Sequence, residues 1–148
     1  MRAFRSFASF VLLFASCIDM HAAARTLTFA KLRNLLESQG FSGGFKGKVR
    51  ISRLGEMDCG GSKLQVYYYT WEETHHPGLA IHAAYRILFL KNSTTYLGQY
   101  KVEDKPKLLK PNKLVFNYSE SDGNSIQCDQ NGLPESVLTN GENLTLFK

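Results

Sequence analysis

The stretch 63–91 constrains the fold most, because no other segment of the chain is as long, as apolar and as aromatic. Two runs within it, 64–71 and 79–90, predict long β-strands, and residues 72–78 predict the loop between them. Aromatic and β-branched side chains suit a pleated, half-buried surface. Neither run is cleanly amphipathic, so we expect both faces of this hairpin to be covered at least in part. Any core must therefore be built against it.

One helix and several shorter strands are predicted around the hairpin. Residues 26–39 carry apolar side chains at helical spacing, with Thr28 as the N-cap and Gly40 where the helix ends. Clusters of Gly, Pro, Asn, Asp and Ser separate the other runs. The further strands are predicted at 48–54, 95–102, 113–118, 125–129, 137–139 and 142–147, with a turn at 55–62 and a loop at 103–112. Together these elements predict an α+β fold, with the N-terminal helix packed on a bent antiparallel sheet or partial barrel of about six to seven strands.

The N-terminus has the three parts of a secretory signal. Arg2 and Arg5 precede an apolar run at 7–14, and three alanines at 22–24 match a cleavage site. The run is too short for a membrane span, which needs roughly 20 apolar residues. We therefore predict a cleaved signal peptide at 1–24 and a single α+β domain at 25–148. The alternative at this end is lipidation of Cys17.

The two remaining cysteines, Cys59 and Cys128, predict a disulfide, since paired cysteines in an exported chain are normally oxidised. Such a bond closes a loop of about 70 residues, for which chain entropy gives roughly 4 kcal/mol. A reactive thiol is the alternative, but neither cysteine has a CxxC partner. The predicted location is periplasmic or secreted. Glycosylation motifs begin at Asn92, Asn117 and Asn143, and we interpret them as chance matches, because Asn117 and Asn143 lie in predicted strands. The alanine-rich cleavage region favours a bacterial source.

The charge of the chain argues against nucleic acid as a partner. The formal net charge is +5, from 18 basic and 13 acidic residues. The densest lysine run, at 101–113, is interrupted by Glu103, Asp104 and two prolines, which favours a solvated loop over a basic binding face. No later apolar run is long enough to span a membrane, and no cofactor motif is present.

The concentrated acid and imidazole groups of the chain are Glu72, Glu73, His75, His76 and His82. Carboxylate and imidazole are suitable zinc ligands. However, adjacent residues in an extended chain point in opposite directions, and the paired spacing of a zinc motif is missing. A carboxylate pair for hydrolysis has the same spacing problem. We therefore predict no catalytic and no metal-binding residue, and keep a small metal-dependent or carboxylate hydrolase at the loop 72–78 as the alternative function.

Alternating aromatic residues supply the other candidate surface. Tyr67, Tyr69 and Trp71 share one face of the first long strand. Such residues are core material first, but Tyr and Trp also concentrate at binding hot spots. The sequence therefore favours an exported non-enzymatic binding module, with an inhibitor of a secreted hydrolase as one concrete form, that recognises a protein or a small envelope ligand. The predicted ligand-binding residues are Tyr67, Tyr69, Trp71, Glu73, His76 and His82.

Overall fold

The computed structural model describes residues 27–73, 82–116, 124–139 and 141–148. The predicted signal peptide at 1–24, which includes Cys17, lies outside the described residues, as does most of the predicted loop 72–78. The description therefore covers the body of the predicted domain and both long strands of its hairpin.

One helix and nine strands make up the described chain. The helix α1 (Phe29–Ser38) begins where the Thr28 hydroxyl accepts a hydrogen bond from the Lys31 amide, and it ends before Gly40, whose φ of +83° suits glycine. The strands, in chain order, are β1 (Lys48–Cys59), β2 (Ser62–Glu73), β3 (His82–Lys91), β4 (Thr95–Val102), β5 (Leu108–Lys110), β6 (Lys113–Val115), β7 (Ser125–Gln127), β8 (Ser136–Thr139) and β9 (Glu142–Thr145).

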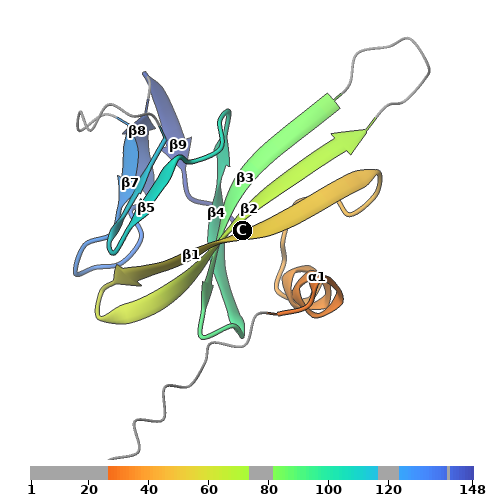
Figure 1. The fold of residues 1–148 in the computed structure, drawn as a ribbon, viewed down its shortest axis with the longest axis horizontal. Coiled ribbons are helices and arrows are strands. Elements are labelled where there is room, and N and C mark those ends of the chain that lie inside the picture. The colour runs from red at the N-terminus through yellow and green to blue at the C-terminus, as the bar shows by residue number, and fades with distance from the viewer. Residues whose placement is uncertain (1–26, 74–81, 117–123, 140) are drawn as a thin grey trace, which may run out of the picture.

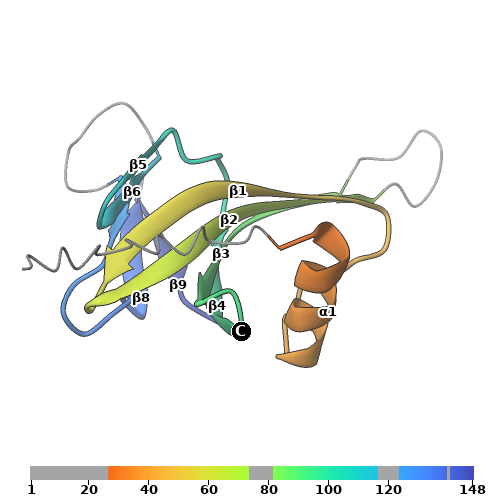
Figure 2. The ribbon, with the colours of Figure 1, turned by 60° about the horizontal axis from the view of Figure 1, so that its bottom comes forward.

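These strands form three antiparallel sheets. The largest has the order β1-β2-β3-β4, the second β5-β6-β7, and the third pairs β8 with β9. The long strands of the first sheet curve, with α1 against one face and the two small sheets on the other side (Figures 1 and 2). Within each sheet, neighbouring strands follow one another in the sequence, so local hairpins account for the pairing inside the three sheets.

The predicted fold class is wrong. Strand makes up 58% of the structure and helix 10%, so the fold is mostly β rather than α+β, and no closed barrel is present in the described part of the chain. The predicted single sheet is instead three separate sheets. The reason is that the periodicity of apolar residues along a strand predicts which face of the strand is buried, but not which other strand it pairs with. The expected packing of the N-terminal helix on a sheet face is observed.

Two local predictions also differ from the structure. The predicted turn at 55–62 is mostly strand, because β1 continues through a bulge between Arg53 and Gly55. The chain reverses only at Gly60 and Gly61, whose φ values are +55° and +73°. The predicted loop at 103–112 contains β5, which pairs with β6 through Leu109 and Leu114. A strand of three residues is too short to show a periodic pattern.

The core has two layers, one on each face of the large sheet. On the helix side, Leu32 and Leu36 of α1 pack with Tyr67, Tyr69 and neighbouring residues of β3 and β4. On the other side, alternate residues of the same strands pack against the small sheets. The members of that layer include Val66, Tyr68, Ile87, Phe89, Tyr100, Leu114, Phe116 and Ile126.

The predicted disulfide is confirmed. Cys59, at the end of β1, is bonded to Cys128, directly after β7, with a Cα–Cα distance of 5.0 Å. Both residues are buried. The bond therefore ties the large sheet to the three-stranded sheet, and its presence is compatible with folding in an oxidising compartment.

Candidate functional site

The predicted aromatic face is part of the core on the helix side. Tyr67 and Tyr69 are 2% and 0% exposed. The Tyr69 hydroxyl donates a hydrogen bond to the carbonyl oxygen of Gly44. The rings of Phe41 and Tyr69 pack edge to face, with their centroids 5.2 Å apart. Burial raises the pKa of Tyr69 to about 12, because the phenolate is poorly solvated there. The observed role of both tyrosines is packing, and a ligand contact for them stays a prediction.

Trp71 lies two residues after Tyr69, on the same face of β2, and is only partly buried. Its indole Nε1 donates to the carbonyl oxygen of Lys46 at 2.6 Å, which fastens the segment before β1 to β2. The ring therefore covers backbone rather than standing free in solvent. Its predicted ligand contact also remains untested.

The acid and imidazole residues of the hairpin end are only partly described. Glu73 and His82 are Cα partners across β2 and β3, so they lie side by side on the ribbon. Glu72 pairs instead with Lys48, at 3.3 Å and with both side chains exposed. His75 and His76 lie outside the described residues. Among the residues that are described, no group of three or more His, Cys, Asp or Glu side chains could hold a metal ion.

A different place, the junction of β4 with β9, has the geometry of a binding site. The backbone of Gln99 exchanges two hydrogen bonds with Phe147, the second residue after β9. In antiparallel pairing, backbone groups that point to one edge recur at every second residue. The N–H and C=O of Lys101 therefore point to the same edge of β4 as those of Gln99.

The facing edge belongs to β9. The Leu146 amide donates to Glu135 on the β8 side, so Thr145 and Asn143 direct their backbone groups away from β8 and towards β4. A continued ladder would pair Thr145 with Lys101. Within the described ranges, no such pair is formed beyond Gln99 and Phe147. The edges of β4 and β9 are thus joined at the Gln99–Phe147 bridge and separate beyond it.

The space between these edges is a hollow of about 330 Å³, which we call the slot. Its volume is at the lower end of the range for small-ligand pockets. Both strands contribute to its wall. The lining residues are Lys101, Val102, Glu103, Glu142, Asn143, Leu144, Thr145 and Phe147.

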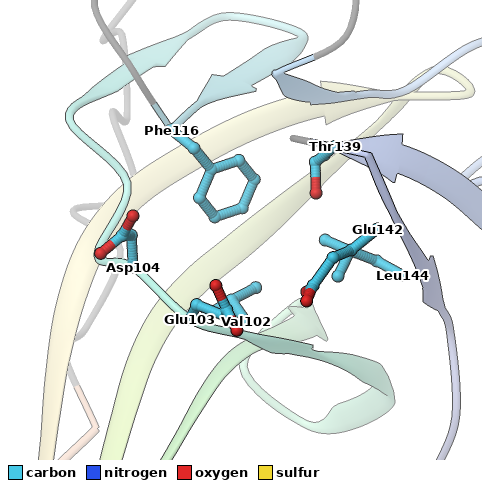
Figure 3. Close-up of a pocket in the computed structure, with 7 residues that line it drawn as sticks. All are labelled: Val102, Glu103, Asp104, Phe116, Thr139, Glu142 and Leu144. Atoms are coloured by element: carbon cyan, nitrogen blue, oxygen red, sulfur yellow. The ribbon is translucent and has the colours of Figure 1, made fainter.

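A smaller cavity of about 20 Å³ adjoins the slot and shares four lining residues with it. Figure 3 shows the Phe116 ring and the Thr139 hydroxyl directed into it, with Leu144 and Val102 on the opposite side. Glu103, Asp104 and Glu142 complete the lining. A space of this size holds about one water-sized group. We call it the acidic cavity, because carboxylates are its charged groups.

Sequence reasoning did not identify these residues. From the sequence, Glu103 and Asp104 are expected only to interrupt a lysine run, and Thr139, Glu142 and Phe116 only to lie in strands. Their grouping depends on three sheets meeting, and the sequence carries no local signal for that meeting.

No protein-family model matches this chain. Comparison with curated proteins gave no significant match. Comparison with solved structures likewise gave none. In the part of the chain that the structure describes, no helix has the length and apolarity needed to cross a bilayer.

Proposed function

We propose that this chain is an exported, non-enzymatic binding module that takes up an extended peptide segment in the slot between β4 and β9. One observation carries the proposal. The edges of β4 and β9 separate beyond the Gln99–Phe147 bridge and present backbone donors and acceptors to each other across a hollow of about 330 Å³. An extended peptide can add to such an edge as a further strand, with main-chain hydrogen bonds giving affinity. Unpaired strand edges are otherwise a liability that proteins cover or blunt.

Export is supported by the N-terminal pattern and by the disulfide. The signal-like sequence at 1–24 directs a chain out of the cytoplasm, and the Cys59–Cys128 bond fits an oxidising compartment. The two together support a periplasmic or secreted location.

The proposal moves the binding surface from the hairpin face to the slot. Tyr67 and Tyr69 are covered by α1 and cannot be reached without separating the helix from the sheet. Glu73, His76 and His82 at the hairpin end remain a predicted second contact surface. The alternative function, a hydrolase at the loop 72–78, also remains a prediction, because that loop lies mainly outside the described residues.

The test uses backbone amide signals in NMR, with the chain 25–148 and its disulfide intact. The probe is an acetylated, amidated octapeptide of alternating serine and valine, which carries no charge. We expect it to slow hydrogen exchange at the amides of Lys101 and Thr145. The same peptide N-methylated at alternate residues cannot form the ladder, so we expect it to have no effect.

A pair of variants separates backbone pairing from side-chain contact. Thr145→Pro removes the N–H that points into the slot at an exposed strand end, where proline is tolerated. Thr145→Val removes the hydroxyl and keeps the N–H. We expect the proline variant alone to lose the peptide effect. Equal binding by both variants, or protection by the N-methylated peptide, would contradict strand addition.

A further inference from the structure

The slot ends at the Gln99–Phe147 bridge, because the edges of β4 and β9 are joined there. We call this the bridge end of the slot. An extended segment between the two edges cannot continue past the bridge without leaving the sheet. A segment that stops there needs no such departure, so the groups around the bridge end are placed to meet a chain terminus.

Two cationic side chains lie opposite each other at the bridge end. Arg86 of β3 and Lys101 of β4 are Cα partners. The Arg86 side chain lies on the helix side of the sheet, where its Nη1 donates to Gln99 Oε1 at 3.0 Å, and Lys101 shares the face of Gln99 on β4. Neither cation forms an ion pair with a described residue. Like charges opposite each other on neighbouring strands are destabilising, and a bound anion would relieve that repulsion.

The surroundings of the Arg86 guanidinium are neutral. Its Nη1 also donates to the Ser42 hydroxyl at 3.4 Å, and its Cζ lies 5.8 Å and 5.5 Å from the ring centroids of Phe41 and Phe147. Its Nε is buried and has no hydrogen-bond partner in the described chain. Buried polar groups usually have a partner, and a guanidinium matches a carboxylate with two parallel hydrogen bonds. Arg86 therefore lacks the kind of group that it binds best.

We propose that Arg86 and Lys101 bind the C-terminal carboxylate of the segment in the slot. This inference rests on the proposed function, which places the segment between β4 and β9. The Lys101 side chain and the Phe147 ring line the slot, and Arg86 lies over that ring, so both cations are next to the bridge end. A free amino terminus is positively charged and is repelled there. The partner is therefore a protein or peptide with an extended, free carboxyl end.

This assignment fixes the direction of the bound segment. β4 runs away from the bridge and β9 runs towards it. A segment whose carboxyl end lies at the bridge is antiparallel to β4 and parallel to β9. A spin label on the amino end of the peptide should therefore broaden the NMR signal of the Asn143 amide more than that of the Phe147 amide. The reverse order would overturn the inference.

A peptide series tests the carboxylate. The acetylated serine–valine octapeptide is compared as the free acid, as the amide, and as an amide whose last residue is aspartate. We expect the free acid to bind about tenfold more tightly than the plain amide, which corresponds to about 1.4 kcal/mol. Salt at about 1 M should reduce this difference by screening. Equal affinity of the aspartate amide and the free acid would overturn the assignment to a chain terminus.

Variants of the two cations test their part in binding. Arg86→Gln and Lys101→Gln should each bring the ratio of free-acid to amide affinity close to one. Lys101 is exposed, so its variant tests the inference even where Arg86→Gln does not fold. Arg86→Lys keeps the charge without the paired donors and should retain part of the ratio. Lys91→Gln, an exposed lysine at the far end of β3 that does not line the slot, is the matched control and should keep the parent ratio.

A small probe, N-acetylvaline, carries the carboxylate but is too short to add a strand. Shifts of the Lys101 side-chain signals by this probe that Arg86→Gln removes, with no amide protection by any peptide, would support the cation pair and overturn strand addition. Equal affinity for the free acid and the amide, with the amides of Lys101 and Thr145 still protected, would overturn carboxylate binding and leave strand addition intact. Absence of both effects would overturn both proposals.

Discussion

Gln99 and Phe147 exchange two backbone hydrogen bonds, with N···O distances of 2.8 Å from the Gln99 amide and 3.0 Å from the Phe147 amide. This pair joins the edge of the four-stranded sheet to the segment that follows β9. Gly98, next to it, has a φ of +155°. A Cβ atom there would lie 3.0 Å from Leu146 Cδ1 and 3.1 Å from the Phe147 carbonyl oxygen. Glycine therefore permits the close approach on which the slot depends.

Replacement of Gly98 by alanine should weaken this junction. The backbone conformation is strained for an L-residue, and the added methyl group presses on Leu146 and Phe147. We expect Gly98→Ala to lower the free energy of unfolding by roughly 1–3 kcal/mol, measured by urea denaturation. Hydrogen exchange of the Phe147 amide should also become faster.

Gly61→Ala is the matched control, since Gly61 has a φ of +73° but open space around its Cα. It should cost about 1 kcal/mol from the backbone alone and leave the Phe147 amide protected. An unchanged Phe147 amide in Gly98→Ala would show that the close approach does not hold the junction together.

The buried face of α1 should contribute far more stability than its exposed face. Leu36 is 0% exposed and packs with the aromatic residues of β2, whereas Phe29 on the same helix is 48% exposed. Leu36→Ala should lower the free energy of unfolding by about 2–5 kcal/mol. Phe29→Ala should change it by about 0.5 kcal/mol. Urea denaturation measures both, and equal losses would mean that the helix does not form one layer of the core.

Removal of the disulfide should destabilise the domain without changing its strands. The bond between Cys59 and Cys128 spans 69 positions of sequence, and loss of a native bond in a small exported domain costs about 2–5 kcal/mol. The double variant Cys59→Ala, Cys128→Ala should therefore unfold at lower urea concentration. Reduced parent protein is the control and should match the variant. A parent that unfolds at the same urea concentration in both redox states would contradict this account.

High pH should destabilise the fold through its buried tyrosines. Burial raises the pKa of Tyr69 to about 12 in the folded protein, against about 10 in the unfolded chain. The unfolded chain therefore releases the phenol proton first as pH rises. This contribution is fully present below about pH 10 and is lost as pH approaches 12, with a magnitude of roughly 2–3 kcal/mol.

The measurement is urea denaturation at several pH values, with Tyr69→Phe as the comparison. Phenylalanine cannot ionise, so the variant should lose less stability between pH 10 and pH 12 than the parent does. At neutral pH the variant should be about 1 kcal/mol less stable, because it lacks the hydrogen bond to Gly44. The same dependence on pH in both proteins would show that Tyr69 ionises freely.

Much of the secondary structure could be predicted because it depends on local patterns. The alternation in β2 and β3 and the helical spacing around Leu32 and Leu36 both describe which side of an element is buried. The alternation correctly separates Tyr67 and Tyr69 from Val66 and Tyr68. It cannot say that α1 covers the tyrosine side, because any apolar layer would satisfy the same pattern.

The slot and the acidic cavity could not be predicted in this way. Glu103 follows β4 and Glu142 begins β9, and only the bridge between Gln99 and Phe147 brings their strands together. A backbone hydrogen bond uses groups that every residue except proline possesses, so residue type does not record which distant strand is paired. The burial of Thr139 likewise depends on where the small sheets meet the large one.

The sequence by itself determined the long hairpin, the amphipathic helix and the pairing of Cys59 with Cys128, because side-chain periodicity and cysteine count are properties of the chain alone. The tertiary structure decided that the strands form three sheets, that α1 covers Tyr67 and Tyr69, and that β4 and β9 part beyond one bridge. These features depend on which apolar faces pack together across long stretches of sequence. Packing of that kind is settled by shape and by backbone geometry, which no local pattern specifies.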